Sequence, residues 1–78
     1  MNNQYNSAIL FNRACAQLRL AQHKLAITDL TLAIELNEDY VKAIMKRAEV
    51  HLKLEQYEEA VRDLERVKQI DPSTAGLR

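Results

Sequence analysis

The sequence repeats itself at an interval of 34 residues. Residues 7–40 align with residues 41–74 without a gap, and eight of the 34 aligned positions hold the same amino acid. A period of this length is typical of repeat proteins in which each repeat is one small supersecondary unit that packs on its neighbours. The identical pairs are Arg13/Arg47, Ala14/Ala48, Leu18/Leu52, Leu20/Leu54, Gln22/Gln56, Ala26/Ala60, Asp29/Asp63 and Leu30/Leu64.

Within each repeat, the apolar residues follow the spacing of two helices. Leu10, Ala14 and Leu18 lie four residues apart, Ala26 and Leu30 repeat that interval, and the second repeat has the same pattern. A short polar segment, AQHK in one repeat and EQYE in the other, separates two helices that must fold back on each other. We therefore predict an all-α fold of two helical hairpin repeats, a fragment of an α-solenoid, with helices near residues 7–20, 24–36, 41–54 and 58–70.

The repeat boundaries also suggest how the chain is organised. We assign residues 1–6 to an N-terminal extension, 7–40 to the first repeat, 41–74 to the second and 75–78 to the start of a truncated following segment. Stacked repeats normally need about three units with polar ends. We therefore expect the chain to be a piece of a longer protein, and the isolated fragment to self-associate through its uncapped ends.

Composition excludes several classes of function. Eleven acidic side chains balance eleven basic ones, so no net charge attracts the chain to nucleic acid or to an anionic membrane. Cys15 is the single cysteine, and no run approaches the length of a membrane span, so we expect a cytoplasmic protein. Neither His23 nor His51 has neighbours at metal-ligand spacing, and phosphate loops, serine elbows and paired catalytic groups are absent. We predict no enzyme activity, cofactor or metal.

One polar pair recurs in both repeats at the same spacing. Arg13 precedes Asp29 by 16 residues, and Arg47 precedes Asp63 by the same interval, so each pair joins the two helices of one hairpin. An arginine can engage a carboxylate through two parallel hydrogen bonds. We therefore interpret these arginines as structural and expect replacement of Arg47 to destabilise the fold more than it weakens binding.

The repeat resembles the tetratricopeptide repeat (TPR) family. That family has an Ala followed four residues later by an aromatic or apolar residue and then by a Pro, a pattern met by Ala26 with Leu30 and by Ala60 with Leu64. Pro72 completes the pattern in the second repeat, whereas the first has Glu38 at that position. The resemblance covers residues 7–74 and implies stacked helical hairpins.

Within this family, FNRACAQL and YVKAIMKRAEV are similar to the second and third repeats of Hsp70 and Hsp90 co-chaperone domains that grip a peptide's C-terminus. With EQYEEAVRDLERV, they are most similar to the repeat region of J-domain co-chaperones of the DnaJ type. The resemblance implies a carboxylate clamp, to which Asn12, Lys42 and Lys46 carry over. A preceding repeat usually supplies a further Lys and Asn, and Arg is more usual than Lys at position 46.

The chemistry of these residues agrees with such a clamp. Asn12 and Lys46 occupy the same repeat position, so stacking is expected to place both on one concave surface, and Lys42 lies one helical turn before Lys46. Arg19 and Lys53 share another position and would extend the basic strip as a possible secondary groove. The partner implied is an Hsp70 or Hsp90 C-terminal peptide.

Two other classes of function remain open. A general TPR scaffold would bind an internal segment of another protein without recognising an anion. An RNA reader is a further possibility, because other two-helix repeats recognise one base per unit. The zero net charge and the absence of an aromatic or basic ladder on the first helices argue against RNA, so we expect no nucleic-acid partner and no membrane partner.

Overall fold

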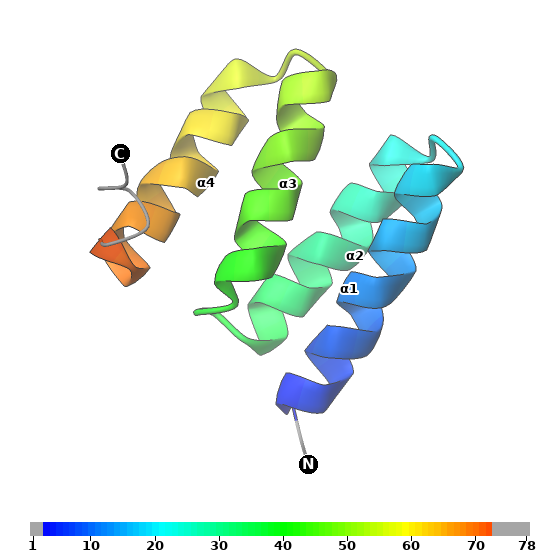
Figure 1. Ribbon diagram of the computed structural model, residues 1–78, viewed down its shortest axis with the longest axis horizontal. Helices are drawn as coiled ribbons and strands as arrows, with labels where there is room; N and C mark the ends of the chain where they lie inside the picture. The colour runs from blue at the N-terminus through cyan, green and yellow to red at the C-terminus, as the bar shows by residue number, and fades with distance from the viewer. Residues whose placement is uncertain (1–2, 73–78) are drawn as a thin grey trace.

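Four helices in an up-and-down arrangement make up the computed structural model, which describes residues 3–72 (Figure 1). They are α1 (Asn3–Arg19), α2 (His23–Leu36), α3 (Val41–Lys53) and α4 (Tyr57–Ile70). No strand occurs within residues 3–72, so the prediction of an all-α fold is confirmed. The first helix begins at Asn3, before the predicted start at Ser7, because no Gly or Pro interrupts the segment between them. The other boundaries agree with the prediction to within one residue, and residues 75–78 lie outside the described part.

Both hairpin turns close in the same way. Ala21 and Glu55, which occupy equivalent repeat positions, have φ angles of 60° and 61°. This left-handed conformation ends α1 and α3, because it lets the N–H groups of Gln22 and Gln56 donate to carbonyl oxygens five residues earlier, those of Gln17 and His51, at 2.9 and 2.8 Å. The polar segments predicted to separate the helices are therefore tight helix-terminating turns.

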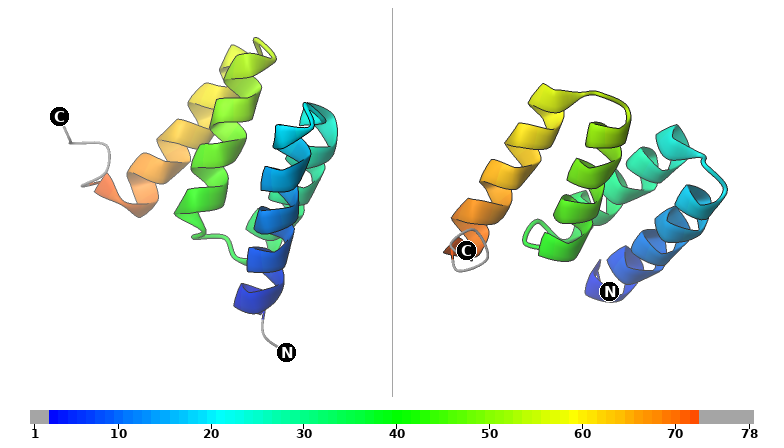
Figure 2. Two further views of the ribbon diagram at one scale, coloured as in Figure 1. Left: turned by 45° about the vertical axis from the view of Figure 1, so that its right-hand side comes forward. Right: turned by 45° about the horizontal axis from the view of Figure 1, so that its top comes forward.

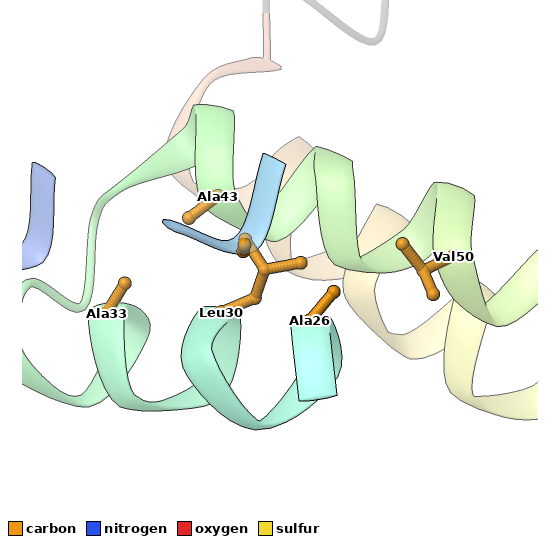
Figure 3. Close-up of a cluster of buried hydrophobic side chains, with 6 residues drawn as sticks. Ala26, Leu30, Ala33, Ala43 and Val50 are labelled. Atoms are coloured by element: carbon orange, nitrogen blue, oxygen red, sulfur yellow. The ribbon is translucent and has the colours of Figure 1, made fainter. Parts of the chain in front are cut away.

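Small residues let the paired helices approach closely. Helix α1 packs on α2, α3 packs on α4, and α2 also contacts α3, so the second hairpin stacks on the first (Figure 2). In Figure 3, Leu30 lies between Ala26 and Ala33 on α2 and points toward α3, where Ala43 and Val50 face it. The alanines at the predicted close-approach positions are all buried: Ala14, Ala26, Ala48 and Ala60.

An arginine on the first helix of each hairpin binds an aspartate on the second. Arg13 donates from Nε and Nη2 to the Asp29 carboxylate at 2.6 and 2.9 Å, and Arg47 donates to Asp63 at 2.9 and 2.7 Å. Both aspartates are buried. Arg47 also donates from Nη1 to the Thr31 hydroxyl at 3.1 Å, which ties the second hairpin to the first. The prediction of two structural Arg–Asp pairs is confirmed.

The helices are short and carry many charged residues. Across residues 3–72, none is both long enough and apolar enough to cross a membrane.

Candidate functional site

The candidate site lies along the first helices of the two hairpins. In the left view of Figure 2, α1 and α3 lie side by side, with α2 and α4 behind them. Residues spaced three or four apart share one face of a helix. On α1 this spacing aligns Asn12 with Cys15 and Arg19. On α3 it aligns four charged residues: Lys42, Lys46, Glu49 and Lys53.

A hollow of about 330 Å³ separates these two rows of side chains, and we call it the inter-helix hollow. Three of its lining residues are basic and one is acidic, while Leu18 and the buried Val50 supply apolar surface. Such a site attracts an anionic chain and still offers contact area for its apolar groups. Its lining residues are Cys15, Leu18, Arg19, Lys46, Glu49, Val50 and Lys53.

A second hollow, of about 340 Å³, lies on the other side of Lys46, and we call it the outer hollow. It shares Lys46 and Glu49 with the inter-helix hollow and adds Lys42. The rest of its lining is apolar and comes from α3 and α4. These residues are Met45, Ala48, Leu52 and Leu64.

Lys42 is held next to α1 by an aromatic ring. Its Nζ lies 5.8 Å from the centre of the Phe11 ring, a cation–π distance, and Phe11 packs in turn against Tyr40 with ring centres 5.6 Å apart. Burial raises the pKa of the Tyr40 phenol. Because Phe11 precedes Asn12, the ammonium group of Lys42 sits beside the part of α1 that carries Asn12.

The predicted site residues are thus distributed over two neighbouring hollows. Lys46 lines both, Arg19 and Lys53 line the inter-helix hollow, and Lys42 lines the outer one. Asn12 is exposed on α1 and lines neither of them. The clamp formed by Asn12, Lys42 and Lys46 therefore stays a prediction.

Among the charged residues that line the two hollows, sequence reasoning missed Glu49. Its Oε1 atom lies 3.2 Å from Nζ of Lys46, so an internal carboxylate already neutralises the most central cation. The spacing of three residues on a helix was a usable signal for this ion pair. The equivalent residue of the first repeat is the uncharged Cys15.

Arg13 and Arg47, which occupy the same position in the two repeats, bind carboxylates within the fold and do not line the inter-helix hollow or the outer hollow. Hydrogen bonds from the Arg13 guanidinium hold the pKa of Asp29 below its ordinary value, against the opposing effect of burial. The same interaction raises the pKa of Arg13. A guanidinium already engaged by a buried carboxylate is a poor anchor for a second anion, which supports the structural interpretation of Arg13 and Arg47.

Two family models match the chain, both described as tetratricopeptide repeat, one over residues 7–40 and the other over residues 41–74. Together with the stacked hairpins, these matches decide the family. The chain belongs to the tetratricopeptide repeat family.

Relatives of this TPR chain include DnaJ homolog subfamily C member 7. The human protein is 40% identical over 70 residues, which cover 90% of this chain and 14% of the relative. The homolog from Dictyostelium discoideum is 40% identical over 73 residues, covering 94% of this chain and again 14% of the relative. The human RNA polymerase II-associated protein 3 is 39% identical over 69 residues, covering 88% of this chain and 10% of the relative. The TPR chain thus corresponds to a small part of each of these proteins.

A solved structure resembles the same fold closely. It is the first TPR of Spaghetti (RPAP3) bound to the HSP90 peptide SRMEEVD, with a TM-score of 0.81 and 40% identity. The match covers 87% of this chain and 54% of that one. The family and its relatives indicate a protein-interaction module related to the TPR regions of DnaJ homolog subfamily C member 7 and RPAP3.

Proposed function

We propose that this TPR chain is a co-chaperone module that binds the acidic C-terminal tail of Hsp70 or Hsp90. Asn12, Lys42 and Lys46 form its part of a carboxylate clamp, and Arg19 and Lys53 form a secondary groove for upstream acidic side chains. One observation carries the proposal: four cations of α1 and α3 line two hollows that adjoin at Lys46. The solved relative with a bound HSP90 peptide supports it.

The chemistry of a tail such as SRMEEVD suits this arrangement. Its last residue, Asp, offers a side-chain and a main-chain carboxylate within a few ångströms, and two ammonium groups and one amide donor can engage them together. Two further glutamates precede it and match the additional cations of the inter-helix hollow. The apolar Met and Val side chains are candidates for the apolar walls.

Each exposed ionic contact contributes only about 1 kcal/mol or less, so this set of contacts is expected to give weak binding. A single cation is then worth up to about fivefold in affinity. The proposal includes a cytoplasmic location, which agrees with the free thiol of Cys15.

Fluorescence titration with labelled SRMEEVD tests the clamp directly. We expect the peptide with a free C-terminus to bind more tightly than the same peptide amidated there, because amidation removes one of the two terminal carboxylates. Lys46→Ala should weaken binding of the free peptide and reduce its advantage over the amidated one. Lys68→Ala, a matched change of an exposed lysine on α4 that lines neither hollow, should leave both affinities unchanged. Equal affinity for both peptide forms contradicts the clamp.

The apolar lining of the outer hollow favours one alternative, a scaffold that binds an internal segment of another protein without anion recognition. Ionic strength separates the two functions. Clamp binding should weaken steeply between low and physiological salt, since its charges are exposed, whereas apolar binding should change little.

A further inference from the structure

Lys42 and Lys46, the two lysines of the proposed clamp, have different neighbours. Lys46 forms an ion pair with Glu49, with 3.2 Å between Nζ and Oε1. Across residues 3–72, Lys42 has no carboxylate within ion-pair distance, and its Nζ lies over the Phe11 ring, 5.8 Å from the ring centre. One lysine is therefore held by a negative charge and the other by an uncharged aromatic ring.

An aromatic ring can orient an ammonium group without neutralising it. The attraction comes from the ring quadrupole, which makes the ring face electron-rich. The ammonium group keeps its charge and the N–H donors that do not face the ring, and all of these stay available to a ligand. A flexible side chain that is ordered only when a ligand binds reduces the affinity, so a lysine that is held beforehand is the better anchor.

The Phe11 ring is itself fixed by packing between the two hairpins. Phe11 lies on α1 and packs against Tyr40, which immediately precedes α3, with ring centres 5.6 Å apart and ring planes tilted by 41°. Both rings are half-buried and pack against the buried core cluster. The ring that holds Lys42 therefore has little freedom to move, whereas Lys42 is exposed and accessible.

We propose that Phe11 is a positioning residue of the clamp. Its ring holds the Lys42 ammonium group, not neutralised by a carboxylate, beside the part of α1 that carries Asn12, where a peptide carboxylate can reach both side chains. This inference rests on the proposed function and names the residue that orients one of its cations. Phe11 acts through Lys42 and needs no contact of its own with the peptide.

The ring of Phe11 can be altered without changing any other residue. Phe11 is the single phenylalanine of the chain, so protein produced with 3,4,5-trifluorophenylalanine carries the change at this position alone. Fluorine withdraws electron density from the ring face and thereby weakens its attraction for a cation, while the ring nearly keeps its shape. The packing against Tyr40 should survive, and circular dichroism will verify the fold.

Fluorescence titration with labelled SRMEEVD measures the consequence for binding. We expect the trifluorinated protein to bind about two- to fivefold more weakly than the unchanged chain, because Lys42 must then be ordered when the peptide binds. Lys42→Met keeps an unbranched side chain and removes the charge, so it provides the matched background. Fluorination of Phe11 in Lys42→Met should leave the affinity unchanged.

Two results of this comparison overturn the proposal. The first is an equal loss with and without the charge of Lys42, since the ring would then act by packing or by touching the peptide. The second is an affinity that fluorination leaves unchanged in the protein that keeps Lys42.

NMR separates failure of this inference from failure of the proposed function. In the peptide-free chain, the ε-methylene protons of Lys42 should resonate upfield of those of the exposed Lys68, because they lie next to an ammonium group over the ring face. Phe11→Leu should remove this displacement. Lys42 protons without a displacement overturn the inference, whether or not the peptide binds. Equal binding of the free and the amidated peptide by the unchanged chain overturns the proposed function, and the inference with it.

Discussion

The two hairpins share one plan but differ in what covers them. The close small-residue contacts inside a hairpin are alike in both, since Ala14 and Ala26 are buried in the first and Ala48 and Ala60 in the second. Contacts between hairpins are not: Leu30 is fully buried, whereas the identical Leu64 is 46% exposed. The same residue at the same repeat position therefore contributes differently to stability, because burial depends on the neighbouring hairpin as well as on the local sequence.

The second hairpin also carries more charge on its second helix. Helix α2 has three residues from the set Asp, Glu, Lys and Arg, and α4 has seven. These charges hydrate much of the surface of α4, which also carries the exposed apolar residues Val61 and Leu64. Charged, solvated positions and uncovered apolar ones thus occur on the same helix.

The largest expected effect is the difference in stability loss between alanine variants of the two equivalent leucines. Leu30→Ala leaves a cavity in the core and should lower the free energy of unfolding by about 3 kcal/mol. Leu64→Ala removes a half-exposed side chain and should cost less than about 1 kcal/mol. Urea unfolding followed by circular dichroism measures both, at a concentration low enough to keep the chain monomeric.

A similar loss for both leucines contradicts the comparison between the hairpins. It would mean that the exposed side of Leu64 is covered in solution. Repeating the measurement at high concentration then tells whether a second copy provides the cover, since only in that case does the cost of Leu64→Ala grow with concentration.

The next largest effect is a difference in stability loss between alanine variants of the two equivalent arginines. Arg47→Ala removes the partner of the buried Asp63 and the bond to Thr31, and should lower the free energy of unfolding by about 2 kcal/mol. Arg13→Ala should cost less, because the Arg13 side chain is more exposed and its hydrogen bonds to Asp29 stay within one hairpin. Chemical unfolding of the two variants side by side gives the difference, and a larger loss for Arg13→Ala would refute this ranking.

These arginine pairs show what the sequence was able to predict. The spacing of 16 residues recurred in both repeats, which made a shared bridge between paired helices the simplest explanation. The same repetition predicted the four helices, since apolar residues at helical intervals carry their own periodic signal. The start of α1 at Asn3 was missed, because polar residues such as Asn and Gln carry no apolar period and favour other conformations.

The site was less predictable than the fold. Lys42 over the Phe11 ring and the hollow between α1 and α3 depend on how two hairpins stack, and stacking is a matter of three-dimensional packing between residues about 30 apart in sequence. The positions of Asn12, Lys42 and Lys46 followed from a family resemblance, and the structure places Lys46, rather than all three, where two hollows meet.

Acid should weaken the first hairpin through Asp29. Its pKa is lowered in the folded chain, so this carboxylate stabilises the fold above its unfolded-state pKa, and the contribution is lost as the pH falls through the folded value. The free energy of unfolding should therefore decrease from about pH 5 toward pH 2. Asp29→Asn, which keeps the shape and removes the titration, should be less stable at pH 7 and lose less on acidification. Thermal unfolding at a series of pH values measures this, and parallel losses in both proteins would rule out Asp29 as the source.

The smallest expected effect concerns the one acidic residue that lines the two hollows, Glu49, whose equivalent in the first hairpin is Cys15. Because Glu49 already binds Lys46 at 3.2 Å, an acidic peptide must compete with it for that cation. Glu49→Gln should therefore tighten binding of SRMEEVD by roughly two- to fivefold, corresponding to less than about 1 kcal/mol for an exposed ion pair. Glu59→Gln on α4 removes the same charge outside both hollows and serves as the control in the fluorescence titration. If Glu49→Gln weakens binding instead, the carboxylate serves to orient Lys46 toward the ligand, and the second hairpin owes its role in the clamp to a pair of residues rather than to a single cation.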